Sequence, residues 1–159
     1  MLDWTRPIPA SESLAVPAPA PPEPTTRPDS VVVGVDGSAA SIAALDWAVA
    51  ESVRDARALH VVLARERPAR APYAPPLPEQ RGDAESVGEL VETVRGHLRG
   101  ARADLVVREG RLEQVLLRES AGAAFLVVGR AAEEAEIGSL ARTCVARAPC
   151  AVVVVSHDG

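Results

Sequence analysis

The chain has 159 residues, a length that predicts one small domain. Its net charge is −5. The acidic balance argues against binding to nucleic acid or to an anionic membrane, because both usually require a basic face. All 17 basic residues are arginine, so the chemistry of a P-loop lysine, a Schiff base or a pyridoxal anchor is excluded.

The first segment, Met1–Ser30, is expected to be a disordered, proline-rich tail. Eight of the fourteen prolines fall here. Proline removes backbone donors and favours extended polyproline II, so no packed structure is expected. A passive extension is the simpler interpretation, and a docking arm or spacer is the alternative.

The stretch Val31–Ser38 reads VVVGVDGS and is expected to be the central strand with the turn that follows it. Its β-branched apolar residues show no polar alternation, which is typical of a strand buried on both faces of a parallel sheet. Gly37 allows a sharp turn, and Ser38 can cap the next helix. Asp36 then lies at the carboxyl end of a central strand, where open α/β sheets bind their ligands.

The remaining chain alternates helical and strand patterns. Apolar residues at spacings of three and four predict helices, and short apolar runs predict strands. The expected elements are a helix over Ser38–Arg54, a strand over Ala58–Ala64, a loop over Arg65–Ala84, a helix over Glu85–Arg99, a strand over Ala103–Arg108, a helix over Leu112–Ala121, a strand over Ala123–Gly129, a helix over Gly138–Ala148 and a strand over Ala151–Val155.

This order predicts an α/β fold, a three-layer sandwich around a five-stranded parallel sheet. The third strand should be an edge strand that turns alternate residues to the core, which are Ala103, Leu105 and Val107. His60 lies inside the second strand, and we expect a core or edge histidine with a partner rather than a catalytic one.

The two cysteines, Cys144 and Cys150, form no metal-ligand spacing with the three scattered histidines and suggest no disulfide framework. Both are expected to be small buried hydrophobes. The N-terminus lacks the pattern of a signal peptide, and no segment has the apolar length of a membrane span. A cytoplasmic location is therefore expected.

The order and spacing of five segments resemble the universal stress protein family. These segments are VVVGVDGS, ALDWA, LHVVLA, FLVVG and GSLARTCVARAPCAVVVV, and the resemblance covers residues 31–156. It implies a flavodoxin-like sheet in the order 3-2-1-4-5 and a cytoplasmic stress-response regulator that is not an enzyme. It also implies a homodimer formed through the edge strand Ala151–Val155.

Many members of that family bind ATP, so the resemblance implies a site for ATP or AMP. Their signature is Gly, two residues, Gly, nine residues, Gly, then Ser or Thr. Glycines let phosphates approach the backbone, and N–H groups at a helix N-terminus hold the phosphate oxygens. The positions implied here are Asp36, Gly37, Ser38, Ala64, Gly129, Arg130, Gly138 and Ser139, with Ala64 near the adenine.

The loop after the fourth strand departs from this signature. Ala132 replaces the middle glycine, and Gly138 follows Gly129 after nine positions instead of thirteen. One carboxylate about 5 Å from a phosphate costs roughly 3 kcal/mol at an effective dielectric constant of about 20, and Arg130 could offset one. The shortened loop carries three such carboxylates, Glu133, Glu134 and Glu136.

Three functions therefore stay open. The first is a nucleotide-responsive stress regulator. The second is a degenerate family member that does not bind ATP and works as a dimeric protein-interaction module. The third is a hydrolase or adenylate-forming enzyme, but no nucleophile–base pair can be assigned, because Ser139 has no histidine partner and is expected to cap a helix.

Overall fold

The structure is a computed structural model that describes residues 29–65, 80–131 and 138–157, except for the side chains of 80–85. Strands and helices alternate along these residues. The elements are β1 (Val31–Val35), α1 (Ala39–Arg54), β2 (Leu59–Arg65), α2 (Gln80–His97), β3 (Ala103–Glu109), α3 (Leu112–Glu119), β4 (Phe125–Ala131), α4 (Ser139–Arg147) and β5 (Ala151–His157).

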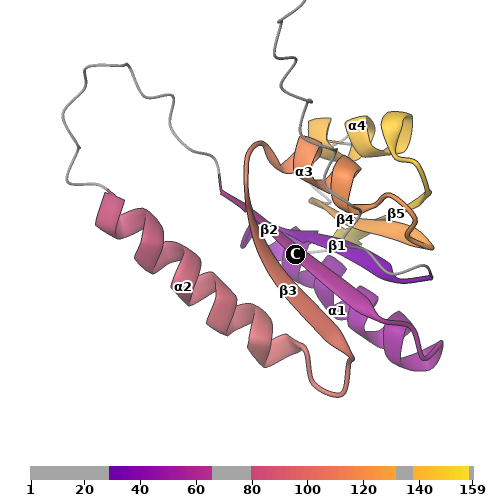
Figure 1. The fold of residues 1–159 in the computed structure, drawn as a ribbon, viewed down its shortest axis with the longest axis horizontal. Coiled ribbons are helices and arrows are strands. Elements are labelled where there is room, and N and C mark those ends of the chain that lie inside the picture. The colour runs from indigo at the N-terminus through magenta and orange to yellow at the C-terminus, as the bar shows by residue number, and fades with distance from the viewer. Residues whose placement is uncertain (1–28, 66–79, 132–137, 158–159) are drawn as a thin grey trace, which may run out of the picture.

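The five strands form one parallel sheet in the order β3-β2-β1-β4-β5, as Figure 1 shows. This confirms the expected α/β fold and strand order. β1 is the central strand, and every one of its residues is buried, because β2 and β4 flank it and helices cover both faces. The apolar run without polar alternation therefore predicted the centre of the fold correctly.

Two helices cover each face of the sheet, so alternate residues of β1 contribute to two separate core clusters. Val33 packs with Leu45 of α1 and Val94 of α2. Val32, one residue earlier, packs on the opposite face with Leu116 of α3 and Cys144 of α4. This alternation follows from the strand period of two and gives the three layers of the sandwich.

The helix α1 begins where the sequence predicted. The side-chain oxygen of Ser38 accepts a hydrogen bond from the backbone N–H of Ser41 at 3.2 Å, which caps the helix. Small, fully buried residues such as Ala48 let the helix lie close to the sheet. Trp47 packs edge-on against Phe125, with 6.1 Å between ring centroids, and belongs to the core on this face of the sheet.

Two boundaries differ from the expected ones. α2 begins at Gln80, whereas a loop was expected as far as Ala84. That expectation arose because the sequence between these two residues has no apolar period that could indicate a helix. The folded domain also begins before Val31, since Ser30 is buried and its carbonyl accepts a hydrogen bond from Ala124. Residues 1–28 of the expected tail lie outside the described residues. No described helix is long and apolar enough to cross a membrane.

The predicted alternation of the edge strand β3 is wrong near its carboxyl end. Val107, expected in the core, has 42% of its surface exposed. Val106, which lies between the residues expected in the core, packs in the cluster formed with α3 and α4. Val106 is covered because α3 and α4 pack on its face of the sheet. Val107 lies near the end of an edge strand, which has a neighbouring strand on one side only.

Candidate functional site

The carboxyl ends of β1 and β4 form the topological switch point of the sheet. The helices after β1 and β2 pack on one face, and those after β3 and β4 pack on the other. β1 and β4 are paired only from Val31 with Phe125 to Val33 with Val127, although β1 continues to Val35 and β4 to Ala131. Open α/β sheets bind their ligands at this kind of position.

Asp36 follows β1 and is held in a local turn. Its carboxylate accepts a hydrogen bond from the backbone N–H of Ser38 at 2.9 Å, and its own N–H donates to the side chain of Ser41 at 3.3 Å. Burial alone would raise the pKa of Asp36, but hydrogen bonds from Ser38 and Ser41 outweigh it and lower the pKa. Asp36 is therefore ionised at neutral pH and partly satisfied within its own turn.

Gly37 and Ser38 have clear structural roles in the same turn. Gly37 has a φ of +89°, a conformation that glycine adopts without strain, as expected for the sharp turn. A Cβ on Gly37 would lie 3.4 Å from Leu90, so α2 also contacts this turn. Ser38 is the cap of α1 described above. Both residues are explained by the fold before any ligand is considered.

Gly129 lies on β4 directly against the first turn of α1. A Cβ at this position would lie 2.2 Å from the carbonyl oxygen of Ala40 and 2.8 Å from the backbone nitrogen of Ser41. No side chain fits there without displacement of the helix backbone. The close packing of helix and strand is therefore sufficient to require this glycine.

Arg130, the next residue, carries an unsatisfied donor. Its Nε atom is buried and has no hydrogen-bond partner in the structure. Leu126 and Val128 precede it at spacings of four and two and pack in the α3–α4 cluster, so Arg130 belongs to that face of β4. A buried N–H group without an acceptor is destabilising, and such groups often mark a missing ion, water or ligand.

The N-terminus of α4 lies at the same edge, because α4 begins after the carboxyl end of β4. The cap residue is Gly138, which has no side chain to accept a hydrogen bond from the first turn. The expectation that Ser139 caps this helix is wrong, since Ser139 is its first helical residue and is exposed. Uncapped N–H groups and the helix dipole favour an anion at such an end.

Residues 28–156 match the model of the universal stress protein family. This chain belongs to the universal stress protein family. Three solved structures support the fold. A member from Burkholderia pseudomallei has a TM-score of 0.65 at 20% identity, with 80% of this chain and 95% of that chain covered. A family protein from Arabidopsis thaliana with AMP bound has a TM-score of 0.55 at 18% identity, with 83% and 93% covered.

The third structure is the universal stress protein from Archaeoglobus fulgidus in complex with dAMP. Its TM-score is 0.56 at 19% identity, with 79% of this chain and 96% of that chain covered. At these identities the likeness shows the fold. Comparison with curated proteins gave no match.

The positions implied by the family resemblance do gather at one edge of this universal stress protein. Ala64 lies near the end of β2, half-buried, with α3 and α4 on its face. Asp36, Gly129 and Gly138 lie at the ends of β1 and β4 and at the start of α4. The loop residues of the shortened signature, Ala132, Glu133, Glu134 and Glu136, lie outside the described residues.

A buried ion-pair network in this universal stress protein was only partly indicated by the sequence. His60 is 4% exposed, and its Nε2 lies 2.9 Å from a carboxylate oxygen of Glu119. Arg108 donates to the other oxygen at 2.8 Å. The expected core histidine is confirmed, but its partner is 59 residues away in sequence. The network joins α3 to β2 and β3.

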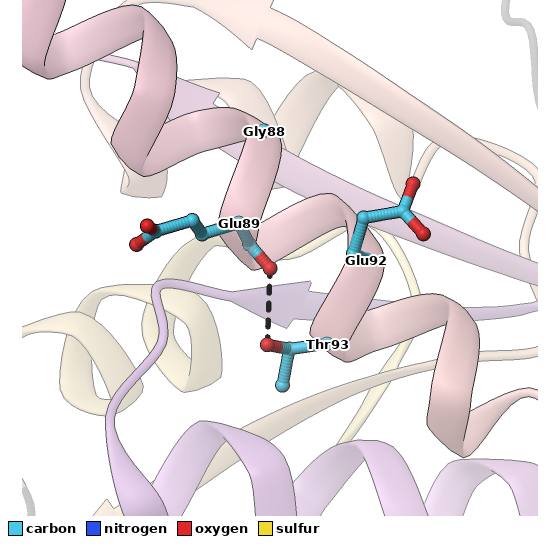
Figure 2. A pocket seen from close by; sticks show the side chains of 4 residues that line it. All are labelled: Gly88, Glu89, Glu92 and Thr93. Carbon is cyan, nitrogen blue, oxygen red and sulfur yellow. Dashed lines mark hydrogen bonds between the residues drawn. The ribbon is translucent and has the colours of Figure 1, made fainter.

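Other candidate sites in the described residues are weaker. A surface hollow on α2 is lined by Gly88, Glu89, Glu92 and Thr93, with the Thr93 hydroxyl donating to the Glu89 carbonyl (Figure 2). Its two carboxylates would repel a phosphate, and it contains none of the expected site residues. Within residues 29–65, 80–131 and 138–157, no cluster of three or more His, Cys, Asp or Glu side chains could hold a metal.

Proposed function

We propose that this universal stress protein is a nucleotide-responsive regulator that binds an adenine nucleotide at the carboxyl ends of β1 and β4. The observation that carries the proposal is the unsatisfied, buried Nε of Arg130 beside the switch point where β1 and β4 stop pairing. A phosphate oxygen is a suitable acceptor for an arginine N–H. The AMP and dAMP complexes of the solved relatives favour the same ligand class.

The remaining groups at this edge suit such a ligand. The uncapped first turn of α4 can donate N–H groups to phosphate oxygens. Ala64 is small and half-buried at the end of β2, which leaves room for an adenine ring near that strand. We propose a regulatory rather than catalytic role, because no base is assigned to Ser139 at this edge. We also propose a cytoplasmic location, which the two free cysteines suit.

An amide chemical-shift titration of the full chain with AMP tests the proposal directly. Binding at the switch point should shift the amide resonances of residues at the carboxyl edge, namely Gly37, Ala64, Ala131 and Ser139. It should leave residues at the opposite edge of the sheet unchanged, namely Leu59, Ala103 and Ala124. No shift at millimolar AMP, or shifts confined to the opposite edge, would exclude a nucleotide site here.

A second candidate function, a dimeric protein-interaction module, is favoured by the contrast between the two edge strands. β5 presents four consecutive valines that are only partly buried. β3, at the other edge, places Asp104 and Glu109 in exposed positions. Charged residues discourage pairing at an edge, whereas an apolar edge invites it. We propose that β5 pairs with a second copy of this chain.

Sedimentation velocity at micromolar concentration tests the homodimer. The exposed positions Ala151 and Ser156 of β5 can be changed to lysine without entering the core. We expect the wild-type chain to be a dimer and the double variant A151K/S156K to be a monomer. The matched control is Asp104→Lys on the exposed edge of β3, which should stay dimeric. A wild-type chain that is monomeric throughout this range contradicts the proposal.

A further inference from the structure

Arg130 and the N-terminus of α4 share one edge and one face of the sheet. Arg130 is the sixth residue of β4 and pairs in register with Ser156 of β5. The strand period places it on the face that α3 and α4 cover. α4 begins at this carboxyl edge, and Figure 1 shows it on the same side of β4 and β5 as α3. An anion at the start of α4 would therefore lie close to the carboxyl end of β4.

The other arginines that the structure describes near this edge, which include Arg108 and Arg142, already have interaction partners. Arg65, at the end of β2, lies 3.4 Å from a carboxylate oxygen of Glu109. Arg111, just before α3, lies 2.8 Å from one of Glu113. Arg130 has no carboxylate partner within the described residues, and its Nε is buried without an acceptor. Among the arginines that the structure describes at this edge, Arg130 is thus the one that a ligand can pair with at no cost to an existing ion pair.

The donors of Arg130 and of the first turn of α4 suit one compact anion as their acceptor. A guanidinium presents its donors in a planar fork that matches the oxygens of one phosphate. The uncapped first turn of α4 adds N–H donors and a partial positive charge of about half a unit. On the neighbouring strand end, Asp36 is an ionised carboxylate and repels any further phosphate. The described groups can therefore neutralise one phosphate group but not three.

We infer that Arg130 recognises the phosphate of a nucleoside monophosphate and that the site discriminates against nucleoside triphosphates. This inference rests on the proposed nucleotide site and assigns its ligand class. Arg130 replaces, in this chain, the neutralisation that a longer glycine loop would supply through backbone N–H groups. The specificity follows from the number of positive groups available rather than from the size of the site.

Isothermal titration calorimetry on the full chain tests the inference with adenosine, AMP, ATP and inorganic phosphate. Divalent cations are omitted, because a bound cation would neutralise part of the charge of ATP. We expect AMP to bind at least about tenfold more tightly than either adenosine or ATP, the range of a charge-assisted hydrogen bond. The variant Arg130→Gln should lose about 10- to 100-fold in AMP affinity and keep adenosine binding within about twofold. The matched control Arg111→Gln should leave all affinities unchanged.

The outcomes separate the inference from the proposed function. Binding of adenosine and AMP with equal affinity, unaffected by Arg130→Gln, overturns the role of Arg130 but leaves the nucleotide site intact. Tighter binding of ATP than of AMP overturns the monophosphate preference. No binding of adenosine or AMP overturns both the inference and the proposed function. Inorganic phosphate binding as tightly as AMP shows that the nucleoside is not recognised and overturns the ligand class.

Circular dichroism checks that the Arg130→Gln variant folds. If it does not fold, Arg130→Lys, which keeps the charge without the planar fork of donors, should show an intermediate loss of AMP affinity.

Discussion

Replacement of Gly129 with alanine should destabilise the fold even when no nucleotide is present. The new Cβ would lie 2.2 Å from the Ala40 carbonyl oxygen and 2.4 Å from its carbon, where ordinary contacts begin at 3.4 Å. Both atoms are backbone, so the first turn of α1 must move by about 1 Å within a closely packed interface. Such overpacking typically costs 1–3 kcal/mol, and a displaced backbone places this variant at about 3 kcal/mol.

Thermal unfolding followed by circular dichroism measures this loss. For a chain of this size about 3 kcal/mol lowers the melting temperature by roughly 9 °C. The matched control is Gly88→Ala on α2, where an added Cβ has no heavy atom within 4 Å. This helical position should gain about 0.5–1 kcal/mol, because alanine has the higher helix propensity. The same substitution should thus act with opposite sign at the two glycines.

The experiment separates two reasons for the glycine. If Gly129 served only to admit a phosphate, its alanine variant would be as stable as the wild type in the absence of nucleotide. A melting temperature within about 1 °C of the wild type would therefore refute the packing argument.

Three further predictions concern stability and reactivity. Ser38→Ala should lower the free energy of unfolding in urea by about 1 kcal/mol through loss of the α1 cap, whereas Ser139→Ala, which is not at a cap position, should change it little. Burial alone would raise the pKa of Glu119, but hydrogen bonds from its arginine and histidine partners lower this pKa. The ionised carboxylate therefore stabilises the fold at pH values above 4.5, its ordinary pKa. This stabilisation is lost as the pH falls through the lowered pKa of the folded state. Glu119→Gln should remove that acid-side slope in urea titrations between pH 3 and 6, and an unchanged slope would contradict the network. Burial raises the pKa of the Cys144 thiol to about 11, so thiol reagents at pH 7 should label it only after unfolding, as mass spectrometry of its peptide can measure.

The sequence predicted the parts of this fold that depend on local patterns. The run of β1 without polar alternation, the cap at Ser38 and the positive φ of Gly37 each depend on residues within a few positions of one another. The sheet order came from the family resemblance rather than from periodicity. The start of α2 was missed because the segment from Gln80 to Ala84 has no apolar period.

The details of the site could not be predicted in the same way, because they depend on contacts between distant segments. The contact of Gly129 with Ala40 joins residues far apart in the chain. The unsatisfied Nε of Arg130 depends on where the acceptors of other described segments lie, which no local pattern indicates. The absence of a side-chain cap on α4 depends on whether the helix begins at Gly138 or Ser139, a difference of one residue that sequence patterns do not resolve.

Several of the residues that the family resemblance implies at the nucleotide site are therefore poor reporters of nucleotide binding. Asp36 is held by its own turn, Gly37 supplies a backbone conformation, Ser38 caps α1 and Gly129 makes room for that helix. Each has a role in the fold whether or not a ligand binds, so a variant at any of them confounds loss of binding with loss of stability. Arg130 differs, because its Nε forms no hydrogen bond whose removal would weaken the fold. Arg130→Gln can consequently separate the two cases. If it loses AMP affinity without a fall in melting temperature, the chain has kept a nucleotide site, and the shared residues do more than maintain the fold.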